Sequence, residues 1–196
     1  MKRFRKILIV LLAILVPVSI GFGFNFFSGE SSDSAENQAM TVEGTLTINQ
    51  ISEAQNLVPG DKICKGVTMN ITSSAVSLLR VKVDIYCADS KTAETDIAPI
   101  KNAGDNWLKG SDGYYYYTQG VKNGDIVKLA EGGIYFNGIN DNVNMNKYQG
   151  KKIKVVANAE LVQAKHGVFA EKWGLSENKD GDIYTKLKKI SNDQGQ

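Results

Sequence analysis

Two segments in which apolar and polar residues alternate constrain the fold of this chain most. In the first, every second residue is apolar: Leu79, Val81, Val83, Ile85 and Cys87. In the second, the same spacing recurs: Ile153, Val155, Ala157, Ala159 and Leu161. Because successive side chains of a strand point to opposite faces of a sheet, both segments are predicted to be strands with one buried face.

Turn sequences divide most of the remaining chain into short pieces. Many of the 19 glycines stand in Asp-Gly, Asn-Gly, Pro-Gly or Gly-Gly steps, and such steps favour tight connections between strands. We expect about six to eight strands and almost no amphipathic helix. The fold class predicted from this pattern is all-β, an antiparallel β-sandwich of jelly-roll type spanning residues 44–174.

The strand at Val67–Ile71 is predicted to pair with the strand ending at Cys87 as a hairpin. In that arrangement Cys64 has the wrong parity to face Cys87, unless a bulge at Lys65-Gly66 reverses it. With the bulge the two thiols can oppose each other, and an oxidising exterior permits a disulfide. The pattern leaves the Cys64–Cys87 bridge open.

Four consecutive tyrosines, Tyr114 to Tyr117, stand between two glycine turns. A strand places two of them on each face of its sheet. Tyr115 and Tyr117, or their neighbours Tyr114 and Tyr116, are expected to fill the space between the sheets, with the other pair on the outer face. Either the outer face is also covered, or this outer pair is offered to another molecule, and the run also fits plain β-propensity and core filling.

The first 27 residues predict export. Four basic residues, Lys2, Arg3, Arg5 and Lys6, precede a stretch without charge from residue 7 to residue 27, which is about long enough to cross a bilayer. Basic residues ahead of such a stretch favour a cytoplasmic N-terminus, so the rest is expected to be extracellular or at the cell surface. No clean A-x-A cleavage site stands before Asn25, so residues 1–27 remain either a signal peptide or a membrane anchor.

Residues 28–43 are mostly small, polar and acidic and are predicted to be a linker. Without the four basic residues of the leader, 19 Lys and Arg remain against 21 Asp and Glu. The exported part is therefore slightly acidic, which argues against a nucleic-acid partner. Residues 175–196 are predicted to be a charged tail.

The residue types needed for catalysis are sparse. His166 is the only histidine, whereas a catalytic zinc usually has several protein ligands with histidine prominent among them. Asn178, Asp180 and Asp182 alternate like a calcium loop, but the glycine and glutamate of such a loop are misplaced, so a hairpin or tail is expected there. The sequence predicts no catalytic residue, no metal site and no cofactor, and hence a non-enzymatic protein.

Three stretches, in order, resemble the TasA/camelysin family of exported proteins that form or decorate extracellular matrix fibres of Gram-positive bacteria. They are GTLTINQ from Gly44, NLVPGDKICKGVTMNITSSAVSLLRVKV from Asn56, and NKYQGKKIKVVANAELVQA from Asn146. The stretch GSDGYYYY and the KWG that ends at Gly174 are similar to small exported relatives. Together they cover most of residues 44–174.

The resemblance implies a jelly-roll sandwich, export through a signal peptidase of the SipW type, and self-association or association with related fibre subunits by donor-strand exchange. In that assembly the segment before the first strand pairs with the sheet of the next subunit. The expected contacts are the apolar residues of this segment and the outer tyrosines: Ala39, Met40, Val42, Tyr114 and Tyr116. Some family members are described as metallo-endopeptidases, an activity that the single histidine argues against here. The alternative is a membrane-anchored extracellular binding module.

Overall fold

The computed structural model describes residues 44–48, 52–54, 56–87, 90–136, 148 and 150–194. Its strands pair only antiparallel in three sheets. Sheet A has the order β1 (Gly44–Ile48), β4 (Val67–Ser73), β8 (Ile126–Leu129). Sheet B has the order β2 (Ser52–Ala54), β10 (Ile153–Gln163), β5 (Ser77–Cys87), β7 (Tyr114–Tyr117), β6 (Trp107–Lys109). Sheet C joins β3 (Lys62–Cys64) to β9 (Ile134–Tyr135).

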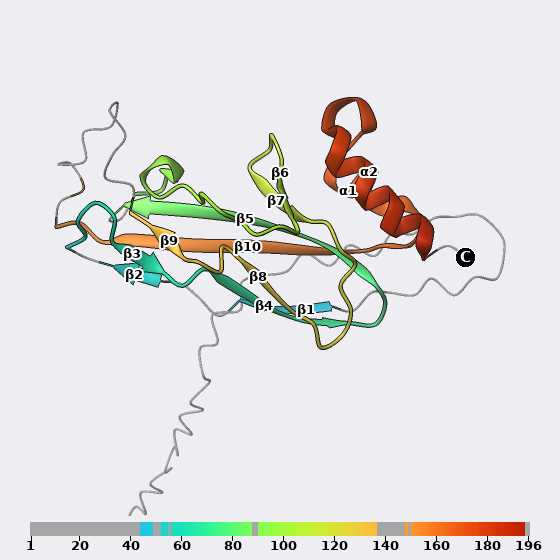
Figure 1. Cartoon of the computed structure of the whole chain (residues 1–196), viewed down its shortest axis with the longest axis horizontal. Helices are drawn as coiled ribbons and strands as arrows, with labels where there is room; N and C mark the ends of the chain where they lie inside the picture. Colours follow the sequence, from blue (N-terminus) through green and yellow to red (C-terminus); the bar gives the residue numbers. More distant parts are fainter. Residues whose placement is uncertain are drawn as a thin grey trace, which may run out of the picture.

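The predicted antiparallel β architecture is confirmed, and the two alternating segments are its longest strands. β5 and β10 pair along their whole length, from Ser77 opposite Gln163 to Cys87 opposite Ile153. Figure 1 shows them running side by side through the length of the molecule. The predicted leader, residues 1–27, and the linker, residues 28–43, lie outside the described residues. Among those described, no helix is long and apolar enough to cross a bilayer.

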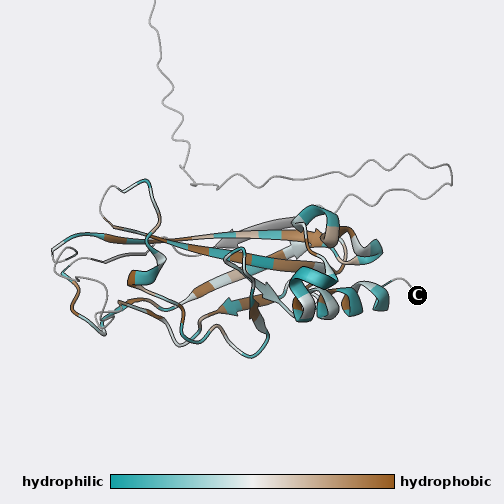
Figure 2. Ribbon diagram, turned by 90° about the horizontal axis from the view of Figure 1, so that it is seen from above, coloured by the Kyte–Doolittle hydropathy of each residue, from teal (hydrophilic) through white to brown (hydrophobic). Residues whose placement is uncertain are grey.

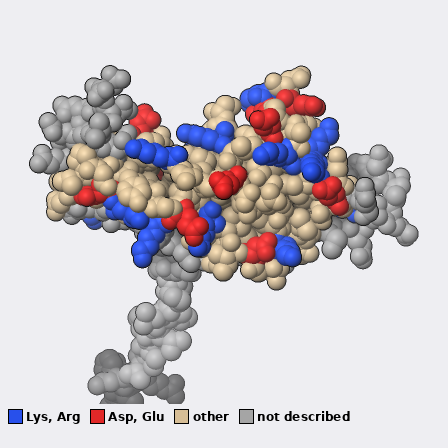
Figure 3. All heavy atoms as spheres, viewed as in Figure 1, with Lys and Arg blue, Asp and Glu red and all other residues tan. Residues whose placement is uncertain are grey.

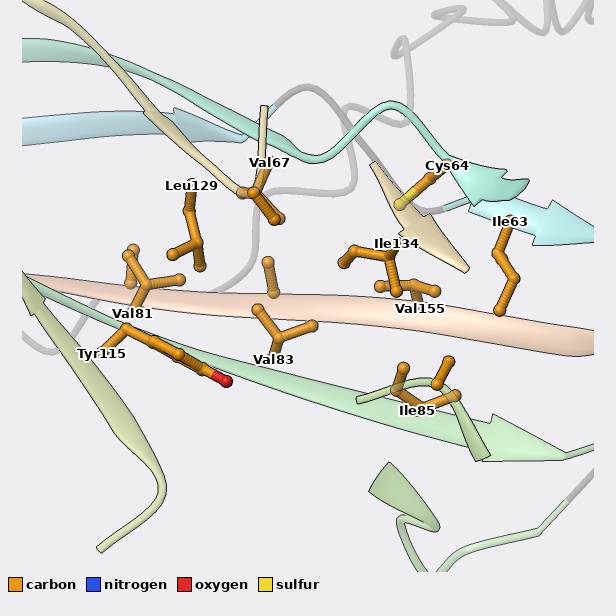
Figure 4. Packing of buried hydrophobic residues seen from close by; sticks show 14 of the residues in the cluster. Ile63, Cys64, Val67, Val81, Val83, Ile85, Tyr115, Leu129, Ile134 and Val155 are labelled. Atoms are coloured by element: carbon orange, nitrogen blue, oxygen red, sulfur yellow. The ribbon is translucent and has the colours of Figure 1, made fainter. Parts of the chain in front are cut away.

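One hydrophobic core lies between sheets A and B. The side chains of β4 and β8 contribute Val67, Met69, Ile71, Val127 and Leu129 from one side. The side chains of β5 and β10 contribute Leu79, Val81, Val83, Ile85 and Val155 from the other. In Figure 4, Val67 and Leu129 point toward Val81 and Val83 across this space. Burial of these apolar surfaces supplies the main driving force for closing the two sheets on each other.

The predicted hairpin between β4 and β5 is wrong. The strands belong to different sheets, so the segment between Ser73 and Ser77 carries the chain across the core. Both serines are buried, and their hydroxyl oxygens lie 2.8 Å apart. The Ser73 hydroxyl also donates to the carbonyl of Ala75 at 2.6 Å. These hydrogen bonds satisfy the buried hydroxyls of the connection between the two sheets. A tight turn could not span this distance, because it joins neighbouring strands of one sheet. The sequence assigned the apolar faces of β4 and β5 correctly. These two faces pack against each other through their side chains, from different sheets.

The crossing also separates the two cysteines. Cys64 pairs with Ile134 in sheet C, whereas Cys87 pairs with Ile153 in sheet B. Both are buried thiols, and the bridge that the sequence left open is not formed in the structure. Burial raises the pKa of the Cys64 thiol, with backbone hydrogen bonds at Gly66 and Ile134 acting in the opposite direction. A raised pKa lowers the thiolate fraction and with it the reactivity of this sulfur.

The predicted charged tail is wrong as well, because most of it is helical. After β10 come α1 (Val168–Trp173) and α2 (Glu177–Asp193). The segment that was compared with a calcium loop lies at the start of α2, which changes direction at Gly181. We call residues 168–194 the helical cap. Figure 1 shows it at one end of sheet B, and in Figure 2 much of its ribbon has the teal of hydrophilic residues.

Gly66 is predicted to be the glycine least tolerant of substitution. Its φ is +96°, and a Cβ would collide with the carbonyl oxygens of Leu129 and Ala130. Backbone strain and overpacking together should make Gly66→Ala cost about 3–5 kcal/mol in the free energy of unfolding. Gly60→Ala is the matched control, since Gly60 has φ +94° but nothing within 4 Å of a Cβ, and should cost about 1–2 kcal/mol. Urea unfolding of both variants tests this, and equal losses would contradict it.

Candidate functional site

The tyrosine run forms β7, and a tight turn fixes it against β6. The amide of Gly110 donates to the carbonyl of Tyr114 at 2.7 Å, and the amide of Gly113 donates to Gly110 at 3.2 Å. The amide of Tyr114 donates to the carboxylate of Asp112 at 3.1 Å. These bonds fix Asp112 beside Tyr114. The short Asp-Gly turn thereby sets the positions of β6 and β7 relative to each other.

Tyr115 and Tyr117 face the main core, which is one of the two arrangements that the sequence left open. Tyr115 stands opposite Val81 of β5, and Tyr117 stands opposite Trp107 of β6. The rings of Trp107 and Tyr117 have centroids 5.0 Å apart. The indole N–H of Trp107 donates to the carbonyl of Lys128 in β8 at 2.8 Å. This aromatic pair therefore joins the edge of sheet B to the edge of sheet A.

Tyr114 and Tyr116 face outward but are covered by the helical cap. Tyr116 is completely buried, in a second core that combines residues of the sheet and of the cap: Leu78, Tyr116, Ala164, Phe169, Trp173, Leu175, Ile183 and Leu187. Tyr114 packs against this core and is partly exposed. The prediction that Tyr116 is a surface contact is therefore wrong. Ala39, Met40 and Val42 lie outside the described residues.

Arg80 is the charged residue at the border between the sheet and the cap. Its guanidinium lies 4.0 Å from the ring centroid of Tyr114 and 5.0 Å from that of Trp173 in α1. Its Nε and Nη2 donate to one carboxylate oxygen of Glu160 at 3.0 and 2.7 Å. The Tyr114 hydroxyl donates to the other oxygen of Glu160 at 2.9 Å. Stacking between two rings suits the planar guanidinium and is worth about 2 kcal/mol when desolvated.

Asp112 completes this cluster from the turn before β7. The hydroxyl of Tyr116 donates to Asp112 at 2.6 Å, and the Arg80 Nη1 donates to the same hydroxyl oxygen at 3.3 Å. Burial, followed by the bond to Asp112, raises the pKa of Tyr116 far above its ordinary value. No buried side-chain polar atom among the described residues is left without a hydrogen-bond partner. The hydrogen bonds of this cluster join side chains of sheet B and its turn, and Trp173 of the cap packs against Arg80 and Tyr116 of the cluster.

The turn sequences that carry the family resemblance have structural roles. In the Pro-Gly-Asp turn, the amide of Val58 donates to the carboxylate of Asp61 at 2.8 Å. Tyr148 of the Tyr-Gln-Gly sequence is buried and donates to Glu94 at 2.5 Å. Its ring packs edge-on against Phe136, with centroids 6.4 Å apart. These residues hold loops in place, as expected of turn sequences.

The single histidine of the chain lies at the surface. His166 is exposed between β10 and α1. Within the part of the chain that the structure describes, no group of three or more His, Cys, Asp or Glu side chains could hold a metal ion. On the face seen in Figure 3, positive and negative side chains are interspersed, so this face presents no broad field of one sign.

The sheet edges differ in how they are closed. The β8 edge of sheet A is tied to the neighbouring loop by the bond from Trp107 and by the amide of Ala130, which donates to Ala103 at 3.1 Å. At the opposite edge, β1 has a strand neighbour on one side only, β4, among the described residues. Such an edge is where an added extended segment can pair.

Comparison with known proteins gives no further assignment: no protein-family model matches the chain, and no curated protein matches it.

Replacing Tyr116 should measure how much the second core stabilises the domain. Tyr116→Ala removes a fully buried ring and should lower the free energy of unfolding by about 3–5 kcal/mol. Tyr135→Ala, at a ring that is 41% exposed in β9, is the control and should cost about 1 kcal/mol. Chemical denaturation of both variants gives the comparison. A loss for Tyr116→Ala no larger than that of the control would mean that the cap does not cover this ring in solution.

The tyrosines also predict a loss of stability in alkali. Burial, as the first cause, raises the pKa of Tyr114, Tyr115 and Tyr116 above the ordinary 10.0. Between the unfolded and the folded pKa the folded state binds more protons, so the free energy of unfolding is undiminished below pH 10 and falls above it. Tyr116→Phe should lessen this slope. Unfolding at several pH values, with absorbance at 295 nm to follow ionisation, tests this, and a flat profile above pH 10 would refute it.

Proposed function

We propose that this chain is an exported, non-enzymatic β-sandwich of jelly-roll type that serves at the cell surface as a subunit or accessory of an extracellular matrix fibre. The observation that carries the proposal is the position of β1. The polar segment 28–43 leads directly into this strand, and β1 ends sheet A on the side away from β4. A segment that precedes an edge strand is well placed to reach the sheet of another subunit.

The contrast between the two edges of sheet A supports assembly at the β1 edge. The β8 edge is tied by the indole of Trp107 and the amide of Ala130, so an incoming strand would have to displace those bonds. Among the described residues β1 has a paired strand on one side only, β4, and it also lies close to β10 of sheet B. Main-chain hydrogen bonds would supply affinity, and alternate side chains of the incoming segment would supply specificity.

The expected donor segment is short of apolar side chains, since it offers Ala39, Met40 and Val42 among mostly polar residues. The outer tyrosines add little, because Tyr116 is buried and Tyr114 is partly covered. Assembly would therefore depend on backbone pairing and on these three residues. The basic N-terminus followed by the uncharged stretch 7–27 supports export, and the ordered resemblance to the TasA/camelysin family supports processing by a signal peptidase of the SipW type.

A membrane-anchored extracellular binding module is the second candidate. It is favoured by the lack of a clean A-x-A site before Asn25. If residues 1–27 are retained, each domain is tethered, and the polar segment 28–43 becomes a spacer from the membrane. Sequencing the N-terminus of the cell-associated protein separates the two candidates, because an intact Met1 indicates the tether.

Fibre formation is tested by negative-stain microscopy of the exported protein at high concentration. We expect filaments or short oligomers, which disappear when residues 28–43 are deleted and weaken when Met40 and Val42 are both replaced by Ser. Replacement of Ser31 and Ser32 by Ala is the matched control and should leave assembly unchanged. Particles that remain monomeric at every concentration, with the segment intact, would rule out the fibre proposal.

A further inference from the structure

The helical cap and the face of sheet B beneath it each depend on the other for burial. The buried apolar side chains of the cap, Phe169, Trp173, Leu175, Ile183 and Leu187, belong to one cluster with Leu78, Tyr116 and Ala164 of the sheet side. If the cap left the sheet, both apolar surfaces would be exposed to water at a large cost in free energy. A displaced cap is therefore stable only on an equivalent sheet face.

The connection between sheet and cap is short and is anchored at both ends. On the sheet side, the amide of Ala164 donates to the carbonyl of Val76 at 3.0 Å. On the cap side, the amide of Gly167 donates to the hydroxyl of Ser191 at 2.8 Å. Only Lys165 and His166 lie between these anchors, and both are exposed. A change in backbone direction at these two residues would separate the cap from its sheet without disturbing either anchor.

The chain is strained at this connection. His166 has φ 65° and ψ 13°, and Gly167 follows with φ 67° and ψ 18°. Left-handed backbone suits glycine, but it carries a steric penalty for a residue with a Cβ. When the cap packs on the sheet of its own chain, His166 is therefore held in a strained backbone conformation. This strain would be relieved if the connection became extended. Short, strained hinges of this kind favour exchange of a terminal element between two copies.

We propose that the helical cap exchanges between two copies of this chain, giving a dimer in which each cap packs on the sheet of the other. Every contact of the second core is conserved in this dimer, including the packing of Arg80 over the ring of Trp173 and the edge-on contact between Trp173 and Tyr116. The closed monomer and the dimer then differ mainly in the two hinges and in the entropy of association. This proposal does not depend on fibre formation, because it uses the cap and not the β1 edge.

The test varies the hinge residue in the full chain, held in mild detergent micelles. His166→Val disfavours left-handed backbone more strongly than histidine, so the dimer should tighten about tenfold or more, because each dimer has two hinges. His166→Gly removes the penalty and should weaken the dimer. Light scattering after size-exclusion chromatography, over a range of concentrations, gives the dissociation constants. His166→Gly keeps the test decisive if the valine variant folds poorly.

Asn56→Val is the matched control, since Asn56 is exposed and has φ 58° but lies outside the hinge. It should lower stability and leave the dissociation constant unchanged, and it carries the same hydrophobic leader. In a mixed sample with half of the copies labelled with ¹³C, isotope-filtered NOEs should connect Tyr116 of one copy to Trp173 of the other. Equal dissociation constants for the valine, histidine and glycine forms, or a dimer without these NOEs, would overturn the proposal.

Discussion

Sheet B must be covered on both faces, and this constraint governs the rest of the structure. Leu78 and Leu79 are adjacent in β5 and both completely buried, and Tyr115 and Tyr116 are adjacent and buried in β7. Because neighbouring residues of a strand point in opposite directions, such pairs require a layer on each side of the sheet. Sheet A covers one face, and the helical cap covers part of the other. The stacked guanidinium of Arg80 lies at the border of the cap and the solvated part of that face.

The strands were predictable because their signal is local. Alternation assigned β5 and β10 and the faces of their residues, and the tyrosine run was correctly placed in a strand. The alternation is the same whether two strands pair side by side in one sheet or face each other across a core. The local sequence pattern therefore cannot distinguish these two arrangements. The segment 74–76 between β4 and β5 lacks the Asn-Gly or Asp-Gly step of a tight hairpin. That absence was the available signal for a crossing between sheets.

The helical cap was missed because its charged residues and the Asp180-Gly181 step resemble a polar tail with a turn. Ile183, Leu187 and Ile190 nevertheless recur at helical spacing and face the second core. The Arg80 cluster could not have been predicted, because Glu160 is 80 residues away in sequence and is placed opposite Arg80 only by the register of β5 and β10. The burial of Tyr116 was missed for the same reason, because the cap is what covers this ring. The Cys64–Cys87 bridge, which the sequence left open, depended on the hairpin that is not formed.

The two tryptophans of the chain lie in different cores. Trp107 is held in the main core by its bond to Lys128, whereas Trp173 lies in the second core against Arg80 and Tyr116. Each is nearly shielded from water, with exposed fractions of 7% and 9%. The molecule thus carries two intrinsic fluorophores that view separate regions. Emission from singly substituted Trp→Phe forms would resolve detachment of the helices from melting of the β-layers, with no dye attached.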